Sequence, residues 1–308
     1  MPTGTRRLDF VRLAEKLAPG GRLLRAWQLK GGLSAGMTAL ELALPGGDRH
    51  RLVLRQAAPG LREMARLLGW LRARGMPVPA PVYFGPDGQR AYGAALALAY
   101  IEGSPQFAPS RPRDYACKLA DQLAALHALP PAAELNFLPY PYPPGLRPFE
   151  RPPENWDESL GEGRIRARLV RAAARVFPTA PALLHGDYWP GNLLWQGDQL
   201  VGVIDWEDAA LGDPLADLAI ARLDLAWIIG PEAMHAFTAR YLQLRPLDTA
   251  GLPYWDLCAA LRLVRLAGPD LPAWAAYFAP CGRSDITPHT IRRTLLSFID
   301  QACAALDH

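Results

Sequence analysis

Residues 183–195 read LLHGDYWPGNLLW, a stretch in which polar residues and a Pro-Gly turn lie between two pairs of leucines. Its polar members include His185, Asp187 and Asn192. Polar side chains in an apolar setting cost free energy unless they are hydrogen-bonded or serve a function. The stretch therefore predicts a loop whose ends are buried and whose Asp187 and Asn192 project toward a ligand.

The composition excludes several classes of protein. The chain has 308 residues, 50% of them hydrophobic, and a net charge of +3, so it has room for one large domain or two modest ones and shows no charge pattern typical of nucleic-acid binding. The four cysteines are scattered without metal-ligand spacing, which favours reduced thiols in a cytoplasmic protein. No apolar run reaches the ~18 residues that indicate a membrane span, and the N-terminal stretch lacks the apolar core of a signal peptide.

The first hundred residues predict a small α+β unit. Apolar periodicity predicts helices over 8–18 and 61–75, the second with its leucines on one face. Alternating or short apolar runs bounded by turns predict five strands, over 22–30, 37–44, 50–56, 76–85 and 92–103.

After Gly103 the pattern becomes mainly helical, which predicts a boundary between residues 1–102 and 103–308. Helices are expected over 112–129, over 158–177 and, with breaks, over 214–304. Prolines and aromatics over 137–156 predict a long ordered loop. A strand pair is expected over 199–209.

Two polar segments have the spacing that phosphoryl transfer requires. The stretch around Asp187 reads HGDxxxxN, and Asp205 follows in IDWE at the end of an apolar run. An attacking hydroxyl needs a carboxylate to orient it and accept its proton, a role for Asp187. Mg²⁺ prefers a few hard oxygen ligands from the protein, a role for Asn192 and Asp205. A glycine-rich turn over 31–36 can cover the phosphates of a nucleotide.

These two segments, with the GDPLADLA that follows them, resemble the aminoglycoside phosphotransferase and choline kinase superfamily, a protein-kinase-like group. The similarity extends upstream in the right order, through four stretches: KGGLSAGMTALEL, LVLRQ, LREMARLLGWL and LALAYIEG. Together the matching stretches span about residues 26–220. Linked motifs in this order are far more specific than a lone glycine turn.

The resemblance implies a bilobal protein-kinase-like fold, with ATP (or GTP) and Mg²⁺ in a cleft between the N-terminal lobe and the rest. It implies that Asp187 is the catalytic base and that Asn192 and Asp205 bind magnesium. It implies further nucleotide-binding positions: Ser34 in the phosphate-covering turn, Arg55 on the phosphates, Glu63 as the partner of Arg55, and the backbone of Ala99 and Ile101 for the adenine. An arginine in place of the usual lysine keeps the phosphate contact.

Several positions keep a second interpretation. His185 is more typical of a residue that holds the loop than of a base, and Asp217 is expected to brace the same loop. Glu207 is either a supporting group at the metal site or a solvated carboxylate. Glu63 on periodicity alone is a surface residue of an amphipathic helix. Aromatic residues of the Pro-rich loop either form a substrate pocket or anchor the loop, and Trp189 is the better candidate for a substrate contact.

The acceptor remains open at this stage. Amino alcohols, sugars, fructosamine-type adducts, homoserine and macrolides all carry suitable hydroxyls, and a metabolic small molecule is the leading expectation. A catalytically idle nucleotide-binding or scaffold protein of the same fold is the alternative, which the intact Asp187, Asn192 and Asp205 disfavour. A protein kinase is disfavoured because the segment after Asp205 leaves no room for a long activation loop. No membrane or nucleic-acid partner is expected.

Overall fold

The computed structural model describes seven stretches of the chain: residues 4–29, 37–56, 59–85, 95–130, 133–139, 158–172 and 179–307. They belong to two compact units, the first formed by Met1–Gly103 with Val201–Glu207 and the second by Ser104–Leu200 with Asp208–His308. The predicted division after residue 102 assigned Val201–Glu207 to the C-terminal lobe, whereas in the structure these residues belong with the first unit.

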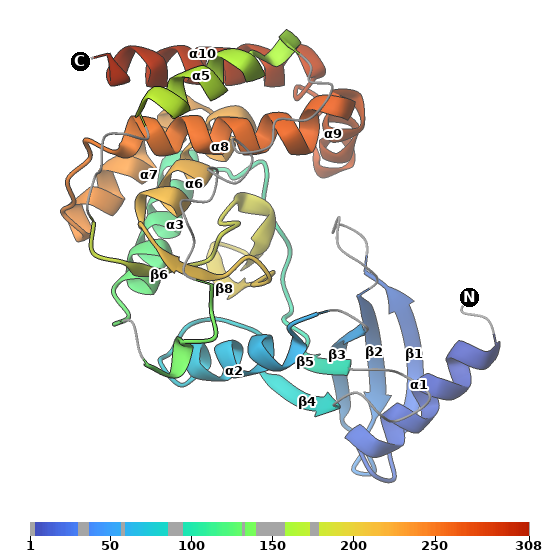
Figure 1. The fold of residues 1–308 in the computed structure, drawn as a ribbon. Coiled ribbons are helices and arrows are strands. Elements are labelled where there is room, and N and C mark those ends of the chain that lie inside the picture. Colours follow the sequence, from blue (N-terminus) through green and yellow to red (C-terminus); the bar gives the residue numbers. More distant parts are fainter. Residues whose placement is uncertain are drawn as a thin grey trace. The chain divides into compact units, whose positions relative to one another are not determined.

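The first unit is built on an antiparallel sheet with the strand order β1-β2-β3-β5-β4 (Figure 1). Its strands are β1 (Arg22–Gln28), β2 (Thr38–Ala43), β3 (Arg49–Gln56), β4 (Pro81–Gly85) and β5 (Ala95–Ala99). Its helices are α1 (Gly4–Leu17) and α2 (Leu61–Arg72). The five predicted strands are therefore present; β3 begins one residue earlier than predicted, and the other four are shorter than predicted at one or both ends.

The apolar periodicities produce this unit's core. On β3, Leu52 and Leu54 are buried while Val53 between them is only partly so, as the pleat requires. Leu54 is paired with Thr38 on one side and Ala97 on the other, so it lies in the middle of the sheet. Phe10 on α1 packs into the same cluster. Helix α2 buries its four leucines, the face that the sequence predicted.

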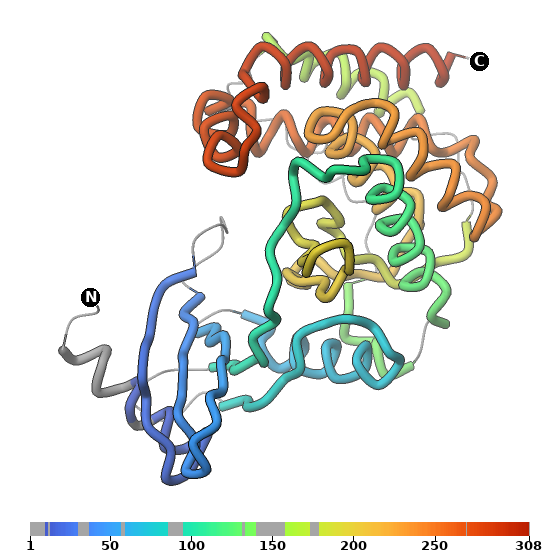
Figure 2. The backbone as a smooth tube through the Cα atoms, turned by 180° about the vertical axis from the view of Figure 1, so that it is seen from behind, coloured from blue at the N-terminus to red at the C-terminus, as the bar shows by residue number. Residues whose placement is uncertain are grey.

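The second unit is mainly helical. Its α-helices are α3 (Pro112–His127), α5 (Glu162–Ala172), α6 (Leu215–Ile228), α7 (Pro231–Leu244), α8 (Leu252–Ala267), α9 (Leu271–Phe278) and α10 (Pro288–Leu306). Short 3₁₀ turns are η1 (Ala133–Leu135), η2 (Glu158–Leu160), η3 (Pro190–Asn192), η4 (Gly268–Asp270) and η5 (Ala279–Cys281). Helix α6 is buried along almost its whole length, and α10 lies alongside α5 and α8 (Figure 2). Of the Pro-rich 137–156 stretch, only Phe137–Pro139 fall within the described residues.

Short strands hold the polar loop. β6 (Ala182–Leu184) pairs with β9 (Ala210–Gly212), with Leu184 opposite Ala210. β7 (Leu193–Gln196) and β8 (Gln199–Val203) form a second two-stranded sheet. The strand pair predicted within 199–209 is wrong in detail, because β8 ends at Val203 and the next strand pairs with β6 instead. The predicted α+β class, a five-stranded sheet followed by a mainly helical region, is confirmed. No helix in the described part of the chain is long and apolar enough to cross a membrane.

Candidate active site

The loop between β6 and β7 brings Asp187 and Asn192 together. The Asn192 amide nitrogen donates to the backbone carbonyl oxygen of Asp187 at 2.9 Å and to its carboxylate oxygen Oδ2 at 3.0 Å. The Asn192 side chain is buried, whereas Asp187 is only partly so. With its nitrogen used in this way, Asn192 keeps its carbonyl oxygen for another partner, and amide oxygens are among the ligands that Mg²⁺ prefers.

The carboxylate of Asp217, on α6, lies beneath this loop. It accepts hydrogen bonds from the backbone N–H of His185 at 2.6 Å and of Gly186 at 2.8 Å. His127 lies 3.2 Å away through Nε2, and its Nδ1 is 2.6 Å from the Tyr241 hydroxyl. Burial would raise the pKa of Asp217, but the hydrogen bond and charge of His127 and the contacts with His185 outweigh burial and lower it. The loop is thus anchored by an ionised buried carboxylate, the bracing role expected of Asp217.

His185 is fully buried and holds the loop from within. Its Nδ1 accepts the backbone N–H of Asp187 at 3.2 Å, which fixes the ring as the acceptor at that atom. The ring packs edge-on against Tyr188, whose hydroxyl donates to the Leu119 carbonyl at 2.9 Å. These contacts favour the supporting role for His185.

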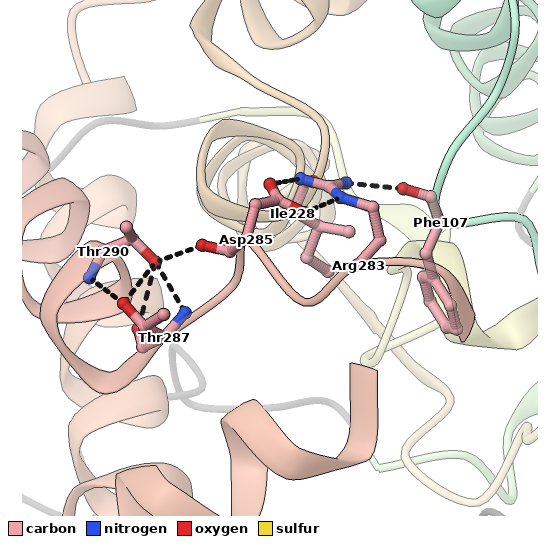
Figure 3. A network of polar contacts seen from close by, with 6 residues as sticks. All are labelled: Phe107, Ile228, Arg283, Asp285, Thr287 and Thr290. Carbon is pink, nitrogen blue, oxygen red and sulfur yellow. Dashed lines mark hydrogen bonds and ion pairs between the residues drawn. The ribbon is translucent and has the colours of Figure 1, made fainter. Parts of the chain in front are cut away.

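Trp189 packs against the protein rather than standing free. Its ring stacks on Phe107, with centroids 6.0 Å apart, and its six-membered ring lies over Gly191, where a side chain would overlap it. The carbonyl oxygen of Phe107 accepts a hydrogen bond of 2.6 Å from Arg283, which also bonds the Ile228 carbonyl and pairs with Asp285 (Figure 3). Arg283 therefore connects the Phe107 backbone, next to Trp189, with the C-terminal end of α6.

Arg262, on α8, is a site residue that the sequence did not indicate. Its Nη2 donates to Asp187 Oδ1 in a close ion pair. Behind it, Asp224 on α6 is buried and accepts from the Trp227 indole N–H at 2.8 Å. Burial raises the pKa of Asp224 to about 7, although the charge of Arg262 opposes this rise. No motif marks Arg262, since 75 residues separate it from Asp187 along the chain.

In the first unit, Arg55 and Asp205 are brought together. The guanidinium of Arg55 is buried, lies 3.8 Å from Asp205 Oδ1 and forms a close ion pair with Glu207. The expected ion pair with Glu63 is not among the contacts of the described residues, so Glu207 takes the place predicted for Glu63. Among the described residues of α2, the guanidinium of Arg55 contacts only Met64, whose sulfur lies 4.0 Å from Nη1. Glu207 is thus an ion-pair partner of Arg55, with 36% of its side chain exposed.

The backbone of Asp205 has a φ of 65°, and no other non-glycine residue in the described part of the chain has a positive φ. This conformation costs about 1–3 kcal/mol for such a residue and persists only where the surroundings impose it. Val203, two residues earlier, donates its N–H to the Pro77 carbonyl at 2.7 Å, which ties this segment to the first unit. The residue with this strained backbone is the one whose carboxylate lies 3.8 Å from Arg55.

The predicted adenine-binding segment lies at the end of β5. The Ala99 N–H donates to the Ala80 carbonyl at 2.8 Å, and the Tyr100 N–H donates to the Arg51 carbonyl at 3.1 Å. The N–H of Ile101 makes no backbone hydrogen bond within the described residues. Ser34 and the glycine-rich turn lie outside the described residues, as do most aromatics of the Pro-rich loop.

The oxygen donors of these residues suit a hard divalent cation that keeps water and phosphate ligands, rather than a cation enclosed by protein side chains. No group of three or more His, Cys, Asp and Glu side chains that could hold a metal occurs in the parts of the chain that the structure describes. Mg²⁺ takes one or two protein oxygens and completes its shell with phosphate and water. The Asn192 amide oxygen and the Asp205 carboxylate are oxygen donors of the kind that Mg²⁺ accepts.

Known proteins resemble this chain in sequence. An N-acetylmuramate/N-acetylglucosamine kinase of Caulobacter vibrioides is 27% identical over 71% of this chain and 66% of its own length. A homoserine kinase of Pseudomonas aeruginosa is 30% identical over 70% of each chain. The matched region thus spans about two thirds of the length of these curated relatives.

Solved structures resemble it in fold. An aminoglycoside-3'-phosphotransferase of type VIII has a TM-score of 0.58 and 27% identity, covering 81% of this chain and 97% of that one. An amicoumacin kinase solved with AMP-PNP and Ca²⁺ shares the fold, with a TM-score of 0.62 at 14% identity over 94% of this chain and 93% of that one. The model of the phosphotransferase enzyme family APH matches residues 32–261, which include Arg55, Asp187, Asn192 and Asp205. The chain belongs to this phosphotransferase family.

Proposed function

We propose that this protein transfers the γ-phosphoryl group of ATP or GTP to a hydroxyl group of a small molecule. The observation that carries the proposal is the loop of Asp187 and Asn192, braced by the buried carboxylate of Asp217. The hydroxyl oxygen forms the new bond to phosphorus, its proton passes to the Asp187 carboxylate, and the nucleoside diphosphate leaves. Catalysis of this kind depends mainly on positioning and charge stabilisation.

Asn192 and Asp205 are the proposed ligands of Mg²⁺. When bound, the cation would neutralise charge on the transferring phosphates. The free carbonyl oxygen of Asn192 and the strained backbone of Asp205 support this assignment. Calcium with an ATP analogue on the amicoumacin kinase supports a nucleotide and a divalent cation in this fold.

Further residues are proposed to bind the nucleotide. Arg55 has a buried, permanently charged guanidinium suited to the phosphates, and Glu207 balances its charge in place of Glu63. Ala99 and Ile101 offer backbone groups to the adenine, supported by the N–H that Ile101 keeps. Ser34 is proposed for the phosphate-covering turn on the resemblance of its sequence alone.

The acceptor is proposed to be a metabolite with a free hydroxyl. The relatives act, by their names, on homoserine and on N-acetylated sugars, so they differ in acceptor while sharing the family. Enzymes with different acceptors can share one catalytic loop, because the reaction involves only the γ-phosphate of the nucleotide and one hydroxyl of the acceptor. The acceptor must then be chosen by residues outside the HGDxxxxN motif.

The test is ADP release in the presence of MgATP and a panel of hydroxyl-bearing metabolites, with the wild type and Asp187→Asn. We expect acceptor-dependent ADP release by the wild type and at least ~10²-fold lower kcat for Asp187→Asn, the effect of removing a positioned base. MgATP binding, followed by thermal shift, should be retained. The control is Asp198→Asn. Asp198 lies on the turn after β7, and its exposed carboxylate pairs with Arg111, so this variant should have the kcat of the wild type.

Two outcomes would contradict the proposal. A fully active Asp187→Asn enzyme would remove Asp187 from the mechanism. Binding of MgATP without turnover of any acceptor would support an idle nucleotide-binding protein instead.

A further inference from the structure

Both carboxylate oxygens of Asp187 are engaged in this structure. Oδ2 accepts from Asn192 at 3.0 Å, and Oδ1 accepts from Arg262 Nη2. A base that orients a hydroxyl needs one oxygen available to it. Asn192 holds its oxygen from within the same loop, whereas Arg262 reaches in from α8, so Arg262 is the partner that an acceptor must displace or share.

Arg262 differs from a purely structural arginine on the same pair of helices. Arg222 on α6 grips the Asp256 carboxylate on α8 through Nε at 3.0 Å and Nη2 at 3.1 Å, and its Nη1 donates to Thr238 at 2.7 Å. Its side chain is 14% exposed. Arg262 is 31% exposed, and within the described residues its one hydrogen bond is to Asp187. A guanidinium carries five N–H donors, so most of those on Arg262 remain for a ligand.

The charges around Arg262 favour a monoanionic partner. The charges of Arg262 and Asp187 both act on Asp224, so these three groups are electrostatically linked at this position. Asp224 is buried against Trp227, and burial raises its pKa to about 7, so near neutral pH it carries only part of a negative charge. Asp187, the direct ion-pair partner of Arg262, therefore supplies the larger part of the compensating charge. If the acceptor occupies Asp187, an acceptor-borne anion restores the balance. A carboxylate matches the planar guanidinium fork with one negative charge, whereas a dianionic phosphate group would face both aspartates.

We propose that Arg262 recognises a carboxylate carried by the acceptor, and that the Arg262–Asp187 ion pair is exchanged for this contact when the acceptor binds. The acceptor is thus a hydroxy acid or a carboxylate-bearing sugar, and Arg262 is the residue that selects it. Without such a group, Arg262 stays on the base. This inference rests on the proposed phosphotransferase function and adds to it the chemical class of the acceptor.

Two matched pairs of acceptors test the proposal, because the members of each pair differ mainly in a carboxylate. L-Homoserine is paired with 3-aminopropan-1-ol, and N-acetylmuramate with N-acetylglucosamine. Initial rates of ADP release give kcat and KM for the wild type, Arg262→Gln and Arg262→Lys. Arg265→Gln is the control, since Arg265 lies on the same helix, is exposed and contacts Glu162 at 3.8 Å.

We expect the wild type to favour the carboxylate-bearing member of at least one pair by about 10-fold or more in kcat/KM. Arg262→Gln should raise KM for that member by about 10- to 100-fold, the range for loss of a charge-assisted hydrogen bond. Its kcat/KM for the neutral member should fall far less, so the preference collapses. Arg262→Lys should recover part of the preference, and Arg265→Gln should match the wild type.

Several outcomes would overturn the proposal. One is a wild-type preference for the neutral members, and another is an unchanged preference in Arg262→Gln. A third is an equal loss of kcat/KM for both members of a pair in Arg262→Gln, when its MgATP thermal shift shows that the variant is folded. Turnover of neutral acceptors alone would overturn the role of Arg262 and leave the phosphotransferase intact. Absence of turnover with every acceptor would overturn the proposed function itself, and the role of Arg262 with it.

Discussion

The guanidinium of Arg55 lies against two carboxylates, those of Asp205 and Glu207, with 8%, 19% and 36% of the three side chains exposed. A buried charge is stable only when it is paired, so Arg55 depends on these groups. Glu207 is the closer partner, whereas Asp205 is the group proposed to hold magnesium. We therefore propose separate roles for the two neighbours of this arginine, charge compensation for Glu207 and metal binding for Asp205.

At this scale we predict that Glu207→Gln destabilises the protein more than Glu63→Gln. Loss of the Glu207 charge leaves Arg55 undercompensated and should cost about 1–2 kcal/mol, since the carboxylate is partly solvated. Glu63→Gln should change the free energy of unfolding by less than about 0.5 kcal/mol, as surface substitutions do. Urea unfolding of both variants measures the difference. A larger effect of Glu63→Gln would restore Glu63 as the partner of Arg55.

At the scale of elements, the loop between β6 and β7 is held in place by backbone groups. Asp217 of α6 binds two successive N–H groups, and Asn192 closes the loop onto the Asp187 carbonyl. Gly186 makes this possible, because its φ is 81° and the carbonyl of Asp208 packs against its Cα. An L side chain there meets both backbone strain and an overlap with main-chain atoms.

We therefore predict that Gly186→Ala costs about 3 kcal/mol or more and lowers kcat, because the loop must shift away from Asp208 and Asp217. Gly197→Ala is the matched control. Gly197, in the turn between β7 and β8, has a φ of 52° with open space around its Cα, so only the strain of about 1 kcal/mol applies. Urea unfolding and ADP release measure both effects. Equal destabilisation by the two substitutions would show that strain alone, without the overlap, governs Gly186.

At the scale of the whole molecule, the sequence predicts those elements and site residues that a local sequence pattern marks. The leucine spacing of α2 and the alternation of β3 marked those elements, because burial follows the 3.6- and 2-residue periods. The HGDxxxxN spacing marked Asp187 and Asn192, which a single loop brings together. Strand β9 was missed, since three residues carry no period, and its partner β6 lies far away in sequence.

The charged partners were the part that the sequence could not supply. Glu63 has the right helix spacing, yet Glu207 reaches Arg55 from 152 residues away. Arg262 is one of two arginines on the largely buried helix α8, and nothing in its sequence neighbours distinguishes it from Arg265. Ion pairs between distant segments depend on how helices pack, and side-chain reach then decides among several candidates. Such pairs become visible only in the folded chain.

Asp224 makes the stability of the whole protein depend on pH. Its pKa of about 7 in the folded state, set first by burial, lies well above the ordinary value of 3.8. Between about pH 4 and pH 7 the folded chain therefore keeps a proton that the unfolded chain releases, and this contribution to stability decreases as pH rises. Above pH 7 the folded state carries the full cost of the buried charge, on the order of 4 kcal/mol for a shift of this size.

We predict that Asp224→Asn stabilises the protein relative to the wild type at pH 8 and that this gain shrinks at pH 5. The amide keeps an acceptor for the Trp227 indole N–H, which is bound at 2.8 Å, and removes the charge. The comparison uses the difference between the two proteins, because carboxylates such as Asp217, whose pKa is lowered, change the wild-type stability in the opposite sense in acid. Urea unfolding of both proteins at pH 5 and pH 8 gives the four free energies required.

Asp256→Asn is the control for this experiment. Asp256 is a buried residue of α8, and burial raises its pKa as it does that of Asp224 on α6. Unlike Asp224, it forms a bidentate pair with Arg222. Its neutralisation strands a buried guanidinium, so this variant should be less stable than the wild type at both pH values. If Asp224→Asn behaves in the same way, Asp224 is a charged partner of Arg262 rather than a neutralised acid behind it. The Arg262 guanidinium would then be compensated from within the protein, and it would have less need of an anion on the acceptor.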